Sequence, residues 1–247
     1  MTLIIDTSQF AGEPDWHLLY ARGARGVIVR GSSGPSHRDT LLDAHIAGAP
    51  RAGIVPLAVY AYCYSWHPGE VQAAFAVQVA ASVGLPTCGD FERSASGPPR
   101  PTDEPARARV TALAWLRHHR ALTGRAAVVY GPVIYLRDMR LAGDDVGPLW
   151  AAHVGVTSPL VPPPWERAVL HQYEHNAKVA GAKKGTFAAV DWNRSELTIE
   201  QLAAVFRGDA VPGFDTLGPV LAGVRAAEGR GATADTFVSR DEGPAIG

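Results

Sequence analysis

Short apolar runs alternate with amphipathic segments along the first 130 residues, and this alternation restricts the fold more than any other feature. Four runs have the composition of buried strands: residues 3–6, 26–30, 56–64 and 126–130. Helical patterns lie between them, most clearly at 39–53, 69–83 and 106–122. Strands that alternate with helices form parallel β-α-β units. We therefore expect an α/β chain built around a parallel sheet.

The pattern changes after about residue 145, where helical segments give way to loops. Three more strand-like segments follow, at 148–154, 168–173 and 186–191. With the strand that ends near Asp90 they bring the total to eight strands, with helices only in the first five crossings. An α/β barrel typically takes about 250 residues. We expect a TIM-like barrel of five β/α units followed by three β-strands, with a C-terminal extension.

The barrel is expected to occupy residues 1–195 and the extension residues 196–247. A capping box at Thr198–Gln201 predicts a short helix that ends near Arg207. A second helical pattern, from Phe214 to Val224, is equally consistent with docking on the side of the barrel that lacks helices and with binding a partner protein. We therefore expect 211–247 to be a candidate segment for a protein partner.

Asp90 and Glu92 lie two residues apart at the end of an apolar run, so strand geometry places both carboxylates on one face. Two acids this close cannot ionise independently, so one keeps its proton near neutral pH and can act as a general acid. Glycoside hydrolysis uses such a pair of carboxyl groups. An isolated D-x-E is more often a pair of surface acids, so the argument depends on the residues that accompany it.

Further motifs occur at the expected strand ends. They include Asp6-Thr7-Ser8, Tyr60-Ala61-Tyr62, Gly89-Asp90-Phe91-Glu92, Pro148-Leu149-Trp150, Gln172-Tyr173 and Val190-Asp191-Trp192-Asn193. In this order the set resembles glycoside hydrolase family 25, the Chalaropsis-type lysozymes. The resemblance covers roughly residues 3–195. It implies hydrolysis of the β-1,4 bond between N-acetylmuramic acid and N-acetylglucosamine in the glycan strands of peptidoglycan.

The resemblance places Asp6, Asp90, Glu92 and Asp191 in a catalytic site at the C-terminal ends of the strands. Glu92 is expected to be the general acid, because the like charge of Asp90 beside it raises its pKa. Asp90 is expected to steady the substrate's N-acetyl group if that group attacks the anomeric carbon, while spacing leaves direct attack by a carboxylate open. Asp6 and Asp191 are expected to shape the electrostatic field and the polarity of the pocket.

Substrate-binding residues are expected at the same strand ends, because sugar rings present apolar faces and polar edges. The expected set is Arg30, Tyr60, Tyr62, Trp150, Gln172 and Tyr173. For each aromatic residue, core packing is the alternative.

Three positions differ from the family's usual pattern. Arg30 opens a segment where an acidic residue is common, His171 stands where an aromatic residue often precedes the Gln-Tyr pair, and His153 stands where tyrosine is frequent. We expect these differences to change glycan preference rather than catalysis.

Composition argues against several classes of partner and cofactor. The net charge is −1 and no basic block occurs, so neither nucleic acid nor an anionic membrane surface is indicated. No apolar run reaches the roughly 18 residues that a membrane span needs, and the N-terminal segment lacks the pattern of a secretory signal. Cys63 and Cys88 are expected to be buried thiols, and neither a metal nor a cofactor is expected.

The sequence is compatible with three functions. The leading one is a peptidoglycan muramidase that is made in the cytoplasm and acts at the bacterial cell wall, with delivery by a phage or phage-like particle favoured by the lack of an export signal. The second is a chitinase-like glycosidase, against which Cys88 argues because that motif requires another acid there. The third is a catalytically silent barrel that serves a larger assembly, against which the four retained acids argue.

Overall fold

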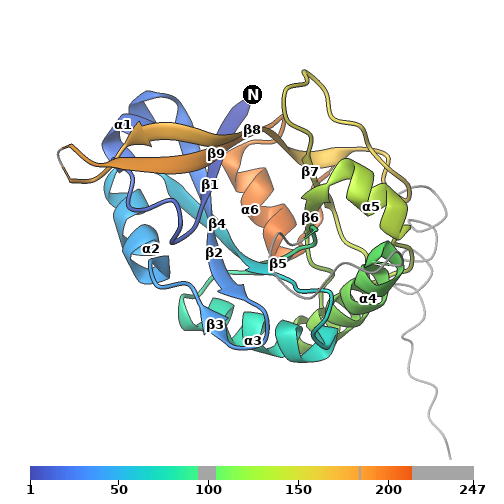
Figure 1. Cartoon of the computed structure of the whole chain (residues 1–247). Helices are drawn as coiled ribbons and strands as arrows, with labels where there is room; N and C mark the ends of the chain where they lie inside the picture. The colour runs from blue at the N-terminus through green and yellow to red at the C-terminus, as the bar shows by residue number, and fades with distance from the viewer. Residues whose placement is uncertain (94–103, 184, 213–247) are drawn as a thin grey trace, which may run out of the picture.

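The structure, a computed structural model, describes residues 1–93, 104–183 and 185–212 (Figure 1). Its strands are β1 (Thr2–Thr7), β2 (Ala24–Ser33), β3 (His37–Arg38), β4 (Val55–Tyr62), β5 (Thr87–Asp90), β6 (Val129–Pro132), β7 (Leu149–Ala152), β8 (Ala168–Ala180) and β9 (Phe187–Ser195). Its helices are α1 (Trp16–Ala21), α2 (Leu42–Arg51), α3 (Gly69–Ser82), α4 (Glu104–Thr123), α5 (Val133–Met139) and α6 (Ile199–Arg207).

Eight of these strands close into a barrel. Their order is β1-β9-β8-β7-β6-β5-β4-β2, and the pairing of β1 with β2 closes the ring, while β3 forms a short hairpin on β2. β9 is antiparallel to both of its neighbours, and the other pairings within the ring are parallel. The expected architecture of five β/α units followed by three strands is confirmed.

The last two barrel strands are longer than we expected. β8 continues to Ala180 and β9 to Ser195, and together they form a hairpin that extends beside α1 in Figure 1. The hairpin is tied to the segment before α1, because the backbone N–H of Asp15 donates to the carbonyl of Ala180 at 2.9 Å. Residues 174–176 are exposed and polar, so the extension lacks the apolar alternation that marks a half-buried strand.

Helix α6 lies at the N-terminal ends of the barrel strands. The expected capping box is present: Thr198 accepts from the backbone of Gln201, and the Gln201 side chain accepts from the backbone of Thr198. Leu202, Val205 and Phe206 pack among barrel residues that include Ile4, Ile28 and Leu57. The helix therefore belongs to the hydrophobic core of the barrel. The second helical pattern, from Phe214 to Val224, lies outside the described residues.

The side chains inside the barrel change from apolar to polar toward the C-terminal ends of the strands. An apolar layer is formed by Ile4, Ile28, Ala58, Cys88, Val128 and Leu170. Side chains two residues further along a strand point to the same face. Those positions hold Asp6, Arg30, Tyr60, Asp90, Tyr130 and Gln172. This polar layer forms the barrel mouth, the end at which barrels of this type carry their active sites.

Candidate active site

Four carboxyl groups meet at the barrel mouth. Asp6 on β1 is directly opposite Asp191 on the antiparallel strand β9, an arrangement that brings Cα atoms to about 4.5–5.5 Å. Asp90 is the last residue of β5, and Glu92 follows two residues later. Closure of the barrel thus joins the first and last strands and places their two acids beside each other, as the sequence predicts.

Two amide side chains hold the pair of acids on β1 and β9. Oδ2 of Asp6 accepts hydrogen bonds from Nε2 of Gln172 at 3.1 Å and from Nδ2 of Asn193 at 2.7 Å. The same Nε2 donates to Oδ2 of Asp191 at 3.3 Å, and Oδ1 of Asp191 accepts from the backbone N–H of Asn176 at 2.6 Å. Gln172 therefore bridges the two carboxyl groups.

The orientation of both amides is set by aromatic donors behind them. The hydroxyl of Tyr130 donates to Oε1 of Gln172 at 2.9 Å, and Nε1 of Trp150 donates to Oδ1 of Asn193 at 2.7 Å. An indole N–H can only donate, so the amide oxygen of Asn193 must face Trp150 and its NH2 group must face Asp6. The barrel interior thus presents hydrogen-bond donors to the acids.

Burial and mutual repulsion raise the pKa of these acids. The pKa of Glu92 is raised to about 7, chiefly by burial and then by the negative charge of Asp191. Burial is also the largest cause of the raised pKa of Asp6, Asp90 and Asp191. The expected repulsion between Asp90 and Glu92 is present as well, because the charge of Glu92 raises the pKa of Asp90 and repulsion between two charges is mutual.

Asp90 carries an unsatisfied acceptor. Its side chain is 3% exposed, and Oδ1 has no hydrogen-bond partner among the described residues. A buried carboxyl oxygen without a donor is costly unless something occupies the site. A substrate N–H or O–H group that entered the mouth would satisfy it.

A family model described as glycosyl hydrolases family 25 matches residues 5–182 of the chain. The chain belongs to glycosyl hydrolase family 25. The match includes Asp6, Asp90 and Glu92, and it ends before Asp191. The resemblance drawn from the strand-end motifs is confirmed, and with it the assignment of the chain as a glycoside hydrolase. No curated protein matches the chain.

Solved structures share the fold of this family 25 enzyme. The bacterial lysozyme from Streptomyces coelicolor matches with a TM-score of 0.70 at 22% identity, over 85% of this chain and 98% of that one. A family GH25 lysozyme from Aspergillus fumigatus matches with a TM-score of 0.70 at 19% identity, over 85% and 99%. The catalytic domain of an endolysin from bacteriophage P40 of Listeria monocytogenes matches with a TM-score of 0.56 at 18% identity, over 85% and 98%.

The aromatic residues expected to contact sugar lie in different places in the family 25 barrel. Trp150 is only 1% exposed, and its ring packs at 4.5 Å from that of Tyr130 and 6.5 Å from that of Tyr60. Its expected role as a sugar contact is wrong for this structure, because the ring is enclosed and its N–H supports Asn193.

Tyr60 stays at the mouth, where burial and the charge of Asp6 raise its pKa. Tyr62 is half-buried and packs edge-to-face on Tyr64 at 5.1 Å.

Tyr173 does not join the acids. Strand alternation places it opposite Gln172, on the outer face of β8, where Arg194 lies over its ring at 4.8 Å. His171 shares that face, and Nε of Arg194 donates to its Nδ1 at 3.3 Å. The outer face of β8 therefore carries Tyr173, and its expected part in substrate binding has no support from the geometry.

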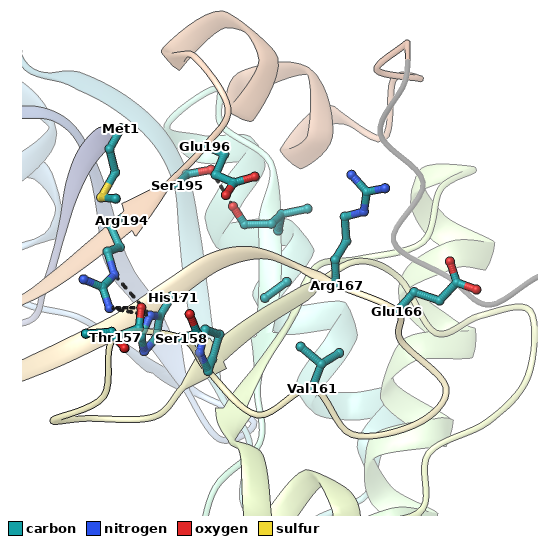
Figure 2. A pocket seen from close by; sticks show the side chains of 13 residues that line it. Met1, Thr157, Ser158, Val161, Glu166, Arg167, His171, Arg194, Ser195 and Glu196 are labelled. Atoms are coloured by element: carbon teal, nitrogen blue, oxygen red, sulfur yellow. Dashed lines mark hydrogen bonds between the residues drawn. The ribbon is translucent and has the colours of Figure 1, made fainter.

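The two histidine departures also lie away from the mouth. His171 lines a cavity of about 270 Å³ formed by the loop after β7, the start of β8 and the end of β9 (Figure 2). In Figure 2, Arg194 and His171 lie side by side next to Thr157. Nδ1 of His153 accepts from the backbone of Leu160 at 3.0 Å, which holds the same loop. These histidines shape the outer wall of the family 25 barrel rather than the sugar site.

Tyr130 and Asn193 are the residues at the mouth that our sequence analysis gave no role. The charges of Asp6, Asp90, Glu92 and Asp191 all act on the hydroxyl of Tyr130 and, together with burial, raise its pKa. A signal existed, since Tyr130 ends an expected strand at the same interior position as Asp90. Only the register of the closed barrel shows that both residues face the acids.

No cluster of three or more acidic, histidine or cysteine side chains suited to a metal ion occurs in the described part of the chain. Among the described residues, no helix is long and apolar enough to cross a membrane. Both cysteines, Cys63 and Cys88, are buried and unpaired, as expected.

Proposed function

We propose that this family 25 glycoside hydrolase is a peptidoglycan muramidase, which cleaves the β-1,4 bond between N-acetylmuramic acid and N-acetylglucosamine. The observation that supports this most strongly is a partly buried Glu92 with a pKa of about 7, set among three further carboxyl groups at the barrel mouth. A general acid for glycosidic cleavage needs a proton near neutral pH and a site that favours a developing positive charge.

Glu92 serves as the general acid in this proposal. Its proton passes to the glycosidic oxygen as the bond from that oxygen to the anomeric carbon breaks. The sugar that keeps the anomeric carbon then develops positive charge. The surrounding carboxylates stabilise that charge in a mouth from which water is partly excluded.

Asp90 steadies the N-acetyl group of the same sugar. Its unpartnered Oδ1 accepts the amide N–H, which turns the acetyl oxygen toward the anomeric carbon. Attack by that oxygen forms a new C–O bond as the leaving oxygen takes the proton of Glu92. Water then opens the ring that results, and Glu92 regains a proton from that water.

Asp6 and Asp191 complete the negative field, and Gln172 keeps both in place through its bridging amide. Tyr60 and Tyr62 are the proposed sugar contacts at the mouth. Burial raises the pKa of Asp6, and the hydrogen bonds that Asn193 and Gln172 donate to it partly offset that rise.

The test is incubation of the full chain with purified peptidoglycan, followed by mass analysis of the released reducing ends. The expected product has N-acetylmuramic acid at its new reducing end. Glu92→Gln keeps the shape of the side chain but lacks the transferable proton, so turnover should fall by about 10²- to 10⁴-fold. Release of peptides alone, of reducing N-acetylglucosamine, or of nothing would reject the muramidase in favour of another class.

We also propose that a phage or phage-like particle delivers the enzyme to the cell wall, with residues 211–247 as a segment for a protein partner. The shared fold with the phage P40 endolysin domain is compatible with this proposal. Purified particles from producing cells should contain the chain, and its detection only as free protein would argue against particle delivery.

A further inference from the structure

An exposed aromatic ring stands at the rim of the barrel mouth. Phe10 follows β1, four residues after Asp6, and its side chain is 82% exposed. A large apolar side chain that is this exposed gains little stabilisation from burial. At the entrance of a site for carbohydrate, such a ring offers an apolar surface to the C–H face of a sugar.

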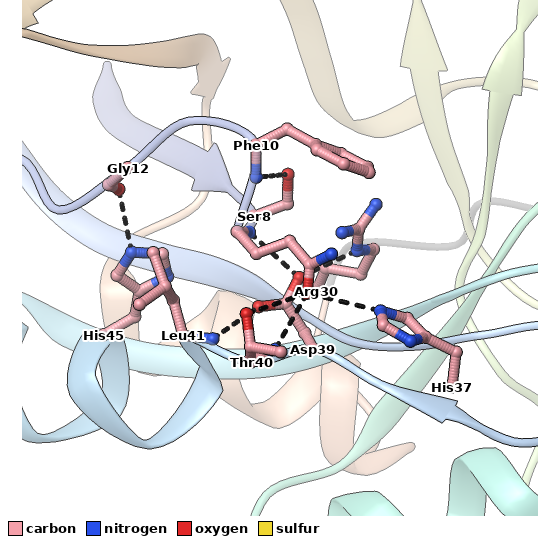
Figure 3. Close-up of polar contacts among 10 residues, drawn as sticks. Ser8, Phe10, Gly12, Arg30, His37, Asp39, Thr40, Leu41 and His45 are labelled. Atoms are coloured by element: carbon pink, nitrogen blue, oxygen red, sulfur yellow. Dashed lines mark hydrogen bonds and ion pairs between the residues drawn. The ribbon is translucent and has the colours of Figure 1, made fainter.

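The ring is held over a buried cation. Cζ of Arg30 lies 4.6 Å from the centroid of the Phe10 ring, and Figure 3 shows the ring beside the end of the arginine side chain. Arg30 is only 6% exposed, and its Nη2 is buried without a hydrogen-bond partner among the described residues. The π face of Phe10 takes the place of an acceptor for this guanidinium.

Arg30 connects the ring to the catalytic acids. It occupies the polar layer of the mouth on β2, and its positive charge lowers the pKa of Asp90 against the stronger effects of burial and of Glu92. Nη2 has no exposed surface for a ligand. The guanidinium contacts the ring of Phe10 and lowers the pKa of Asp90, and its expected direct contact with sugar stays a prediction.

Asp39 fixes the backbone of the residue next to Phe10. Asp39 is 0% exposed, and its Oδ2 accepts from Nε of Arg30 at 2.8 Å and from the backbone N–H of Gln9 at 2.9 Å. Its Oδ1 accepts from the backbone N–H of Leu41 at 3.0 Å. Oε1 of Gln9 in turn accepts from the backbone N–H of Thr40 at 2.9 Å. Gln9, the residue before Phe10, is thus held through both its backbone and its side chain, and Figure 3 shows Arg30, Thr40 and Leu41 around Asp39.

We propose that Phe10 is a further substrate-binding residue, whose ring is a platform for one hexose ring of the glycan strand, and that Arg30 and Asp39 are its positioning residues. The inference rests on the proposed muramidase function. A preset platform loses little conformational entropy when the sugar binds, so its contribution goes to affinity. It lies on the β1–β2 side of the mouth, across the barrel from β6 and β7.

The first test compares Michaelis constants on soluble glycan strands. Phe10→Ala should raise KM about 3- to 10-fold and change kcat by less than about two-fold, because a contact made equally in the ground and transition states changes KM and not kcat. Phe10→Tyr should keep KM within about two-fold. The side chain is exposed, so both variants should keep one cooperative melt, and Phe10→Ala should lower the melting temperature slightly more than Phe10→Tyr because it removes the ring from the buried guanidinium.

Phe187 offers a matched control. It is also an exposed phenylalanine, at 65%, with the cation Lys178 Nζ 4.0 Å from its ring centroid. It begins β9, four residues before Asp191 and toward the far end of the β8–β9 hairpin. Phe187→Ala should leave KM unchanged, and an equal rise in both alanine variants would remove the special role of Phe10.

A double-mutant cycle tests the positioning. Arg30→Gln should raise KM in the otherwise unchanged enzyme and should raise it much less when combined with Phe10→Ala, since both changes remove the same contact. Additive effects would show that Arg30 does not act through the ring. An unchanged KM in Phe10→Ala overturns the platform itself.

Binding separates this inference from the proposed function. Dissociation constants for isolated, insoluble peptidoglycan can be measured with Glu92→Gln, alone and combined with Phe10→Ala. A weaker affinity of the double variant by about 3- to 10-fold supports the platform even if the products of hydrolysis contradict the muramidase. Equal affinities reject the platform even if hydrolysis proceeds as proposed.

Discussion

Glu92 keeps its proton mainly because the barrel mouth buries it, and only secondarily because another acid lies nearby. Asp191, which reaches the mouth from the last strand, adds its negative charge to this effect, and Asp90 and Glu92 repel each other. Asp191 is itself held by Gln172 and by the backbone of Asn176. The protonation of the proposed acid therefore depends on barrel closure.

This arrangement predicts how the pH profile responds to substitution. Activity needs protonated Glu92, so kcat/KM should fall as pH rises above about 7. Asp191→Asn removes the negative charge that favours the proton, so the pKa of Glu92 should drop and the alkaline limb should move to lower pH. Asp90→Asn also removes a like charge and should move that limb in the same direction, while it reduces turnover. The measurement is kcat/KM from pH 4 to 9, and an unchanged limb in Asp191→Asn would contradict this account.

The same burial predicts a stability cost that varies with pH. The pKa of Glu92 is above its ordinary value of 4.5 in the folded protein, so ionisation is harder in the fold than in the unfolded chain. The stability present at pH 4 is therefore lost progressively as pH rises toward 7.

Glu92→Gln has no charge to bury and should escape this loss. At pH 8 it should be more stable than the unchanged protein by roughly 3 kcal/mol, and at pH 4 the two should be nearly equal. Urea unfolding at both pH values checks the prediction. A difference that is independent of pH would instead indicate a change in packing.

At the scale of elements, α6 and the β8–β9 hairpin pack on different parts of the barrel. The hairpin pairs with the segment before α1 through the bridge between Pro14 and Gly181. Helix α6 covers the apolar ends of the strands opposite the mouth with Leu202 and Phe206. The polar catalytic residues can therefore lie at the mouth, because α6 closes the opposite end of the barrel with apolar side chains.

The capping box of α6 should be measurable in the stability of the whole barrel. Thr198→Ala removes the acceptor for the backbone N–H of Gln201 and should cost about 1 kcal/mol of unfolding free energy. Thr198→Ser keeps a hydroxyl and should cost clearly less. Because α6 packs in the core, urea unfolding followed by tryptophan fluorescence should report the change as one transition. No loss in Thr198→Ala would mean that α6 is not coupled to the barrel.

At the scale of the molecule, the packing of α6 predicts where the chain can be shortened. Removal of residues 213–247 should leave a cooperative melt within about 2 °C of the full chain, because the eight barrel strands and α6 all precede residue 213 and pack against one another. Removal from Thr198 onward takes away Leu202, Val205 and Phe206 and should abolish that melt. Calorimetry of the two shortened chains shows whether each still has a cooperative melt. If the first also unfolds, the C-terminal segment is part of the barrel core and not a candidate for a partner.

Several features of this protein follow from the sequence alone. The alternation of strands and helices predicts the five β/α units, and the loss of helices after residue 145 predicts the three strands that follow. The capping box predicts α6. The acids Asp6, Asp90 and Asp191 are also predictable, since each sits at a strand end. These features depend on local periodicity and on neighbours close in the chain, which one sequence contains.

Tertiary structure decided what those acids face. Period-2 alternation says that Gln172 and Tyr173 point in opposite directions, but only barrel closure shows that Gln172 points inward to bridge two acids while Tyr173 lies outside. The enclosure of Trp150 likewise joins two strands, and the support of Phe10 joins the segment after β1 to Arg30 on β2. Burial, pKa and ring contacts depend on distances in space between segments remote in the chain, and those distances are set when the barrel closes and its loops pack.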